Sequence, residues 1–430
     1  MINRILLFGD TFGLPIALKI IPARLIGALV GAEIRQHQHA DLRRLAEAHN
    51  LPFLIQPKAS SSTYPAFVER VRKIEPDLIL VNSYSMLIRP EILALPPYGA
   101  INIHGALLPQ YRGSNPTQWA LINNESETGG TMHYMTADFD AGDIIARRRV
   151  PIYFEDTWLD IQGRLAEATE DLLRDELPKL LSQTNDRQPQ DETRARHYRR
   201  RRPEDGLIDW QQSVLSIYNL VRALVKPHPG AFYYTDATKV VLDEALSIPS
   251  IAALKYGAEG GQKLESAQVR LIPISFESMQ AALDLLHDNK PSVKFDNQAS
   301  ASRQFFEDLQ SRSDEVVFGV RLLENDLMIG AGRLHNIDYS ERRAELQIKF
   351  NPAVAHSEGL NNEVVRLLLD FAFEDINLDR ICLRALRNDL ATIKVYEKVG
   401  FTRQDVSLEV AHNKDEDVWI GIKREEYVGK

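Results

Sequence analysis

The chain has 430 residues, of which 44% are hydrophobic and 26% charged, and its formal net charge is −9. This length and composition predict two or three folded domains and exclude a disordered protein. The acidic balance argues against a protein that binds nucleic acid mainly through charge. A single cysteine, Cys382, excludes an intrachain disulfide and a cysteine-based zinc site.

The N-terminus begins with a short apolar run, residues 5–8, that leads into a turn. We therefore expect a first strand at this place rather than a signal peptide. No apolar run reaches the 18 residues of a membrane-spanning helix. These features predict a cytoplasmic, multidomain protein with no membrane partner.

The first 155 residues alternate between short apolar runs and segments of helical periodicity. Strands are expected at residues 5–8, 25–30, 52–55, 77–81 and 101–103, and helices at 41–49, 64–74 and 90–95. This alternation predicts an α/β fold with a Rossmann-like, mainly parallel sheet that is covered on both faces. Such sheets bind ligands beyond the carboxyl ends of their strands. The first turn, residues 9–13, is not GxGxxG, which argues against a nicotinamide dinucleotide.

Polar side chains follow two strands, the one at 101–103 and a further one expected at 131–136. Asn102 and His104 close the strand at 101–103, and Asp140 lies in an acidic turn, residues 138–143. Taken singly, they could merely cap a strand and form a turn. Together they suit acyl transfer, in which an amide and an imidazolium stabilise an oxyanion, and one such donor contributes about 10²–10³ in rate. A nearby carboxylate can orient the imidazole or accept the amine proton.

The surroundings of these residues resemble the folate-dependent formyltransferases. His104 and Asp140 lie 36 positions apart, as the matching residues do in that family. The other shared elements occur in the same order, namely Asn102-Ile103-His104, Leu107-Leu108-Pro109, Tyr111-Arg112-Gly113, Pro116, Gly129-Gly130-Thr131 and the turn at 138–143. The resemblance implies that Asn102, His104 and Asp140 are the catalytic triad and that 10-formyltetrahydrofolate is the donor. It also implies two folate-binding segments, represented by Met86, Leu87, Ile88, Thr136, Asp138 and Phe139.

The residues that select the acceptor are expected further along the chain. There a helix at 158–181 and a polar linker at 182–193 lead into an arginine-rich stretch. Residues 202–210 and the segments 221–223 and 227–232 resemble the second region of sugar-nucleotide formyltransferases. Enzymes that act on initiator tRNA would continue into a complete basic β-barrel, whereas here only residues 239–246 look like its beginning. We therefore expect a nucleotide-linked amino sugar as partner and no nucleic acid. An aminoacyl-tRNA or an amino acid derivative is the alternative acceptor.

Three arginines are candidates for holding the substrate, for instance through a pyrophosphate: Arg112, Arg202 and Arg222. Solvated loops or structural ion pairs are the alternative for each of them. The histidines show no metal-ligand spacing, so no metal is expected.

The last 160 residues restart the α/β pattern. Strands are expected at 269–273, 316–323, 328–337, 344–350, 380–386 and 418–423, and helices at 276–287, 304–309, 362–373 and 391–398. With Asn388, Ala391, the run 396–398 and Gly400-Phe401, this order resembles the acetyl-CoA-dependent N-acetyltransferases of the GNAT superfamily. The resemblance implies that Tyr396 protonates the leaving thiolate.

The pyrophosphate loop of that superfamily is only partly matched. Residues 356–361 keep Gly359, but Asn361 adds a side chain where main chain should approach phosphate. Gly359, Asn361, Asn388 and Tyr396 are the candidate acetyl-CoA residues. The alternative is a non-catalytic domain for sugar binding or dimerisation.

The predicted organisation is a catalytic domain at 1–190, a truncated formyltransferase C-terminal region at 191–250, a linker at 251–267 and a GNAT-like domain at 268–430. A weaker similarity is to enzymes that acetylate the 4-amino group of a UDP-linked 6-deoxy sugar in pseudaminic acid synthesis. This similarity implies a bifunctional enzyme of surface-glycan or O-antigen biosynthesis. The truncated middle region and the fused domain suggest a homodimer.

Overall fold

The computed structural model describes residues 1–236, 238–257, 260–286, 299–351, 358–404 and 417–427. The chain divides into two compact units, Met1–Asp205 and Gly206–Lys430. Among the helices within these ranges, none combines the length and the apolarity that crossing a bilayer requires.

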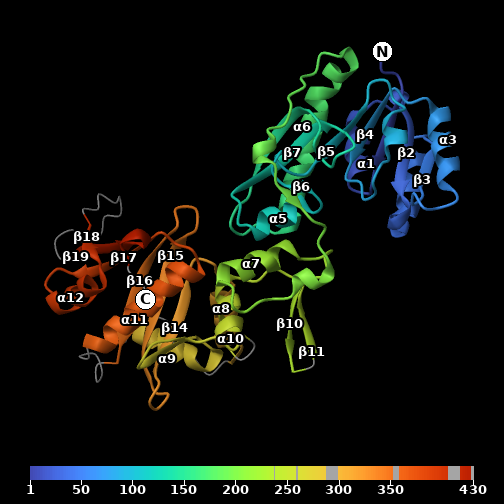
Figure 1. Ribbon diagram of the computed structural model, residues 1–430. Helices are drawn as coiled ribbons and strands as arrows, with labels where there is room; N and C mark the ends of the chain where they lie inside the picture. Colours follow the sequence, from blue (N-terminus) through green and yellow to red (C-terminus); the bar gives the residue numbers. More distant parts are fainter. Residues whose placement is uncertain (237, 258–259, 287–298, 352–357, 405–416, 428–430) are drawn as a thin grey trace. The chain divides into compact units, whose positions relative to one another are not determined.

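The first unit is built on a seven-stranded sheet with the strand order β3-β2-β1-β4-β5-β7-β8 (Figure 1). Five strands run parallel: β1 (Ile5–Gly9), β2 (Ile26–Ala32), β3 (Phe53–Gln56), β4 (Leu78–Asn82) and β5 (Ala100–His104). β7 (Glu127–Tyr134) and β8 (Ile144–Pro151) complete the sheet in the antiparallel sense. The predicted mainly parallel sheet is thus confirmed. β8 was not predicted, because three successive arginines, 147–149, hide its alternation.

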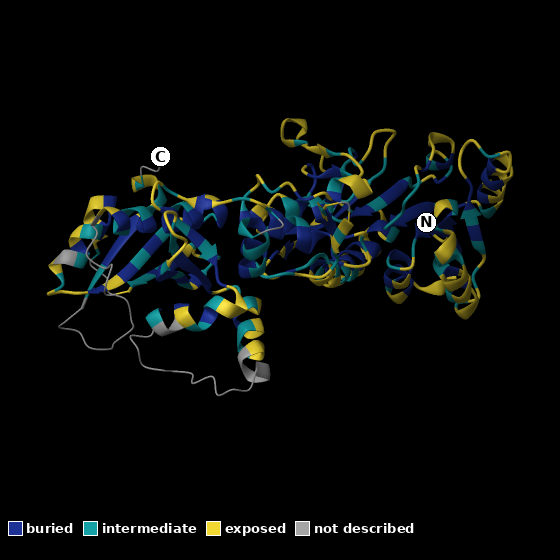
Figure 2. Ribbon diagram, turned by 90° about the horizontal axis from the view of Figure 1, so that it is seen from below, coloured by how far each residue is buried: buried dark blue, intermediate teal, exposed yellow. Residues whose placement is uncertain are grey.

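Helices cover both faces of this sheet. Ile5 and Leu7 of β1 pack with the apolar side chains of α1 (Gly13–Ile20), α2 (His39–Ala48) and α6 (Trp158–Ser182). Leu6 and Phe8 point the other way and pack with α3 (Tyr64–Ile74) and α4 (Pro90–Leu93). A central strand that buries both of its faces must be apolar throughout, as the run ILLFG is. Figure 2 shows the strands buried between helices whose outer faces are exposed.

Shorter elements complete the first unit. They are η1 (Ala23–Leu25), η2 (Glu33–Gln38), α5 (Pro116–Ile122), η3 (Glu192–Arg194) and η4 (Pro203–Gly206), which ends at the first residue of the second unit. β6 (Arg112–Gly113) and β9 (His197–Tyr198) form a separate parallel pair. This pair matters for the site, because it brings residues 188–198, expected to be a linker and a basic loop, against the loop that follows β5.

The second unit begins with α7 (Val214–Ala223) and the hairpin of β10 (Ala231–Thr235) and β11 (Thr238–Leu242). The stretch after it, predicted to be a linker, instead contains α8 (Ile248–Tyr256) and the short strand β12 (Leu264–Glu265). α8 is capped by the side chain of Ser247, which accepts a hydrogen bond from the Ser250 amide. Its buried residues include Ile248, Ile251 and Lys255.

The rest of this unit is an eight-stranded sheet with the order β12-β13-β14-β15-β16-β17-β19-β18. The strands are β13 (Val269–Pro273), β14 (Val316–Leu322), β15 (Met328–Asp338), β16 (Arg343–Phe350), β17 (Arg380–Leu386), β18 (Thr402–Arg403) and β19 (Asp417–Lys423). The helices are α9 (Phe276–Leu286), α10 (Ala299–Ser311), α11 (Glu358–Asp370), a π-helical turn (Phe371–Asp375), α12 (Leu390–Val399) and η6 (Arg424–Glu426). These elements agree with the predicted C-terminal α/β domain.

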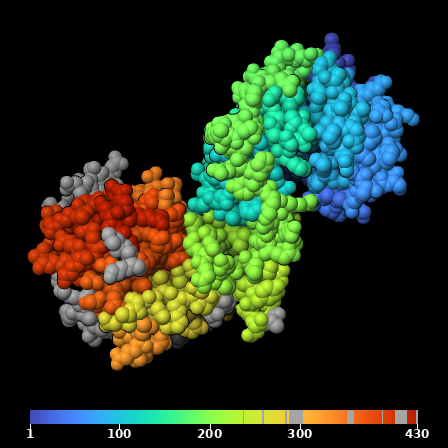
Figure 3. Space-filling view, viewed as in Figure 1, coloured from blue at the N-terminus to red at the C-terminus, as the bar shows by residue number. Residues whose placement is uncertain are grey.

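A buried ionic cluster joins α8 to this sheet domain. Asp375 of the π-helical turn accepts bonds from Lys255 Nζ at 2.6 Å, from the Val214 amide at 3.0 Å and from the Tyr256 hydroxyl. Burial, followed by the charge of Asp375, raises the pKa of Tyr256 far above its usual value. In the space-filling view the yellow segment that contains α8 and α9 lies against the orange strands of the same unit (Figure 3).

Candidate active site

The site lies at the carboxyl end of β5, where the parallel part of the sheet meets β7. In the antiparallel register Asn102 is opposite His133, and His104 is opposite Thr131. Directly paired residues of two strands share one face of a sheet, so His133 stands beside Asn102. The strand end therefore presents an amide and two imidazoles together.

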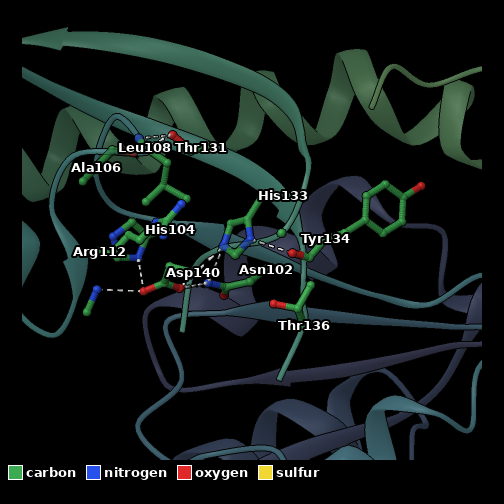
Figure 4. A network of polar contacts seen from close by, with 12 residues as sticks. Asn102, His104, Ala106, Leu108, Arg112, Thr131, His133, Tyr134, Thr136 and Asp140 are labelled. Carbon is green, nitrogen blue, oxygen red and sulfur yellow. Dashed lines mark hydrogen bonds and ion pairs between the residues drawn. The ribbon is translucent and has the colours of Figure 1, made fainter. Parts of the chain in front are cut away.

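Asp140 is the centre of the cluster, as Figure 4 shows. Its Oδ2 lies 3.7 Å from His104 Nδ1 and accepts a hydrogen bond from the Gly113 amide at 2.9 Å. Its Oδ1 lies 3.6 Å from His133 Nε2 and 3.4 Å from Asn102 Nδ2. The structure brings together Asn102, His104 and Asp140, which the sequence analysis selected, and adds His133, which it did not.

The surroundings of Asp140 keep its carboxyl ionised. Burial by itself would raise the pKa of Asp140, but His104, His133 and the Gly113 amide lower it well below its usual range. The residue also has φ = +54°, a left-handed conformation that side chains rarely adopt. The contacts from His104, His133 and Gly113 therefore hold a charged side chain in a strained turn.

Backbone carbonyl groups fix both imidazole rings. His104 Nε2 lies 2.8 Å from the Tyr111 carbonyl oxygen, and His133 Nδ1 lies 2.8 Å from the Tyr134 carbonyl oxygen. A carbonyl oxygen only accepts, so each of these nitrogens carries a proton. The other nitrogen of His104, Nδ1, faces the Asp140 carboxylate at 3.7 Å. His133 Nε2 lies between two groups, 3.2 Å from Asn102 Nδ2 and 3.6 Å from Asp140 Oδ1.

Thr131 supports the loop between β5 and β6. Its hydroxyl accepts from the Leu108 amide at 3.1 Å and donates to the Ala106 carbonyl oxygen at 2.6 Å. Arg147 of β8 adds a bond from Nε to the Leu108 carbonyl oxygen at 2.9 Å. The Leu-Leu-Pro turn is thus anchored to β7 and β8.

The two segments that we expected to hold folate are positioned by polar contacts. Buried Gln56 donates to the Leu87 carbonyl oxygen at 2.9 Å and accepts from the Tyr84 hydroxyl at 3.0 Å. The Thr136 hydroxyl donates to the Asp138 carbonyl oxygen at 3.1 Å. Leu87 and Phe139 are 55% and 63% exposed, and such apolar side chains at the site fit a flat aromatic ligand. Ile88 is buried in the core, whereas Met86 is half-buried.

The three candidate arginines differ in their surroundings. Arg112 is only 2% exposed, and its guanidinium is bound by Gln190 and Glu192. These protein contacts differ from the substrate contact that we predicted for Arg112. Arg202 is exposed and belongs to the first unit. Arg222 is buried on α7 of the second unit, where its Nε donates to Asn219 at 2.8 Å.

The predicted acetyl-CoA residues lie in the second unit. β16 and β17 pair in parallel over three residue pairs only, from Arg343 with Arg380 to Glu345 with Cys382. Asn388 is exposed beyond β17, and Gly359 and Asn361 lie in the first turn of α11. Burial raises the pKa of Tyr396 far above its usual value, so its hydroxyl keeps its proton. The preceding loop, residues 352–357, lies outside the described residues.

Comparison with protein families matches three parts of the chain. Residues 28–177 match Formyl transferase, residues 201–263 match Formyl transferase, C-terminal domain, and residues 269–402 match Acetyltransferase (GNAT) domain. The chain joins a formyl transferase to a GNAT domain. Within the described ranges, no group of three His, Cys, Asp or Glu side chains of the fused chain is placed to hold a metal ion.

Solved structures similar to this formyl transferase part share little sequence with it. A sugar N-formyltransferase from Shewanella sp. is 20% identical, with 57% of this chain and 98% of that chain covered and a TM-score of 0.48. A 4-N formyltransferase from Francisella tularensis is 17% identical, with the same coverage and a TM-score of 0.47. An N-formyltransferase from Helicobacter canadensis, in complex with folinic acid and dTDP-3-aminofucose, is 16% identical, with 63% and 95% covered and a TM-score of 0.44.

Proposed function

We propose that this protein transfers a formyl group from 10-formyltetrahydrofolate to the amino group of a nucleotide-linked amino sugar. The observation that carries this proposal is the cluster of Asn102, His104 and Asp140 at one strand end, within the part of the chain that matches Formyl transferase. The donor supplies the formyl carbon, to which the amine nitrogen bonds as the bond between that carbon and N10 breaks.

The residues of the site have complementary roles in this reaction. The Asn102 amide and the His104 ring turn their donors from Asp140, which lies 3.4 and 3.7 Å away, to the formyl oxygen as negative charge develops on it. Asp140 faces His104 at 3.7 Å and, as the ionised carboxylate nearest the reacting groups, accepts the proton of the attacking amine. That proton then passes to N10 of the leaving group. His133 holds the Asn102 amide in place.

For the folate we propose contacts with the two segments beside this cluster. Main-chain groups of residues 86–88 and of residues 136–139 would bind the polar edge of the ring system. Leu87 and Phe139, which are exposed, would cover its faces. The fixed carbonyl group of Leu87, held by Gln56, supports this assignment, because a rigid backbone can present hydrogen-bonding groups at constant spacing.

For the acceptor we propose a sugar nucleotide rather than a tRNA. The motif at residues 202–210 supports it, and so does the end of the formyl transferase C-terminal region, where the chain passes from the β10–β11 hairpin into α8. The net charge of −9 also suits a small anionic substrate better than a polynucleotide. Arg202, exposed at the end of the first unit, is the candidate for a phosphate contact.

We propose that the GNAT domain uses acetyl-CoA, with Gly359, Asn361 and Asn388 as binding residues and Tyr396 as the proton donor to the thiolate. The protonated state of buried Tyr396 supports this role. The proposed domains are residues 1–190, 191–250 and 268–430. α8, which lies in the stretch expected to be a linker, belongs to the second unit.

The test is an acceptor screen with 10-formyltetrahydrofolate, in which UDP- and dTDP-linked 3-amino and 4-amino sugars are compared with initiator aminoacyl-tRNA by mass spectrometry. A mass gain of one formyl group on a sugar nucleotide, lost in His104→Ala, is the expected result. Formylation of the tRNA alone would overturn the acceptor assignment. No formylation of any acceptor, with donor binding unchanged by His104→Ala, would overturn the proposed activity.

A further inference from the structure

We infer that Gln190, in the segment expected to be a linker, is the positioning residue that fixes the loop of the Asp140 carboxylate. Its Nε2 donates two hydrogen bonds, to the Asp140 carbonyl oxygen at 2.7 Å and to the Gly142 carbonyl oxygen at 2.8 Å. The two bonds bracket the turn that carries the carboxylate. This inference rests on the proposed formyl transfer, in which Asp140 handles the proton.

Arg112 fixes the orientation of the Gln190 amide. The amide oxygen accepts from Arg112 Nε at 3.1 Å and from Arg112 Nη2 at 2.8 Å. Since both guanidinium donors occupy the oxygen, the amide NH₂ group must face the Asp140 turn. Glu192 completes the arrangement as a bidentate partner of the same guanidinium, at 2.6 and 2.9 Å.

The same arginine is covalently adjacent to the second support of Asp140. Gly113, the next residue, donates its amide to Asp140 Oδ2 at 2.9 Å. The Arg112 amide in turn donates to the Arg196 carbonyl oxygen at 2.8 Å, within the β6–β9 pairing. Backbone and side chain of residues 112–113 therefore connect the carboxylate, its turn and residues 190–196 into one network.

Such a network is needed because the Asp140 turn would not hold itself in place. A left-handed, non-glycine residue costs about 1 kcal/mol or more in backbone energy and relaxes when its supports are removed. A shift of the carboxylate by about 1 Å is enough to lower a rate about 100-fold. The Gln190 amide is fully engaged by Arg112 and the turn, so Gln190 acts on the reaction through the position of Asp140.

The experiment compares Gln190→Ala and Gln190→Glu with Gln188→Ala. The carboxylate introduced by Gln190→Glu would still accept from Arg112, but it has no N–H to offer and turns an oxygen toward two carbonyl oxygens. Gln188 is an exposed neighbour whose hydrogen bonds with Ile144 are made by its backbone, so it serves as the matched control. The readouts are kcat and KM for each substrate, the unfolding midpoint, and hydrogen–deuterium exchange of the peptide 136–146.

Both Gln190 variants should lower kcat about 10- to 100-fold and change KM less than about threefold. Exchange in residues 136–146 should rise while the unfolding midpoint stays near that of Gln188→Ala. A purely structural role would lower the midpoint and leave kcat of the folded protein unchanged, which would overturn the inference. If wild-type protein formylates no acceptor, the exchange arm still decides whether Gln190 orders the turn, so the two proposals fail separately.

Discussion

Asp140 receives support from five groups on four segments of the first unit, four of them at its carboxylate and one at its backbone. Asn102 and His104 come from β5, His133 from β7 and the Gly113 amide from β6, and Gln190 adds the hold on the backbone. No single partner accounts for its ionised state, because burial opposes ionisation and several contacts together overcome it. The site is therefore sensitive to small changes in any of these segments.

The lowered pKa of Asp140 makes a prediction about stability and pH. Because the folded-state value lies below the unfolded value of about 3.9, ionised Asp140 stabilises the fold above that pH and loses this contribution as the pH falls toward the folded-state value. Asp140→Asn should thus be less stable than wild type at pH 7, and the difference should shrink below pH about 4. Urea unfolding of both proteins at several pH values measures it. A difference that stays constant with pH would contradict the assignment.

His133 is expected to matter for catalysis as well. His133→Phe keeps a ring of similar size but removes the nitrogen that faces Asn102 and Asp140. We expect kcat/KM for formyl transfer to fall about 10- to 100-fold, as for the loss of one oriented donor or its support. His37→Phe, on an exposed residue of η2, is the control for the substitution itself. Equal kinetics of the two variants would show that His133 has no role in the reaction.

At the scale of single residues, the sequence indicated those site residues that belong to a local motif. Asn102 and His104 stand two positions apart on one strand, so alternation alone places them on one face. His133 carries a weaker signal, a polar residue in an apolar strand, which becomes meaningful only when the register with β5 is known. Gln190 carries none, because its role depends on contacts 50 and 78 positions away in the chain.

At the scale of elements, the short pair β6–β9 shows how a glycine can be required by its surroundings. Gly113 has φ = +101°, and a Cβ built on it would lie 2.3 Å from the Tyr198 carbonyl oxygen. By contrast, Gly163 lies inside α6 with no atom within 4 Å of such a Cβ. The two positions therefore predict opposite effects of the same substitution.

Gly113→Ala should destabilise the first unit by about 1–3 kcal/mol, since the backbone must leave the left-handed region and β9 must move. Because the Gly113 amide binds Asp140, kcat should fall as well. Gly163→Ala should instead stabilise the protein by about 0.5–1 kcal/mol and leave kcat unchanged. Thermal unfolding followed by circular dichroism, together with the formylation assay, checks both. Stability changes of the same sign would show that the close approach to Tyr198 is not decisive.

Regular periodicity predicted most elements, and charge or short length concealed the others. α3 and β13 have the predicted bounds, because their apolar residues repeat without interruption. β8 and α8 were missed for physical reasons. In β8 the three successive arginines 147–149 interrupt the alternation of apolar and polar residues. In α8 apolar residues occur on every face of the helix, so there is no amphipathic stripe to recognise.

At the scale of the whole molecule, the two family matches of the second unit meet in a shared interior. The formyl transferase C-terminal match contains Val214, Lys255 and Tyr256, and the GNAT match contains their common partner Asp375. No sequence pattern could pair these residues, which are more than 100 positions apart. The two matched regions are therefore joined by more than the covalent chain. The end of the formyl transferase C-terminal match packs inside the core of the second unit, together with residues of the GNAT match.

Breaking this cluster should destabilise the second unit as a whole. Asp375→Ala leaves Lys255, whose side chain is 9% exposed, as a buried charge without its carboxylate, and such losses cost about 3–5 kcal/mol. Asp314→Ala is the matched control, because its ion pair with Arg312 is exposed and should be worth less than about 1 kcal/mol. Hydrogen–deuterium exchange under native conditions resolves the units. Exchange should rise in both α8 and β14–β16 of Asp375→Ala and stay unchanged in β1–β5. If α8 alone loosened while the sheet kept its protection, the two matched regions would be independent folding units.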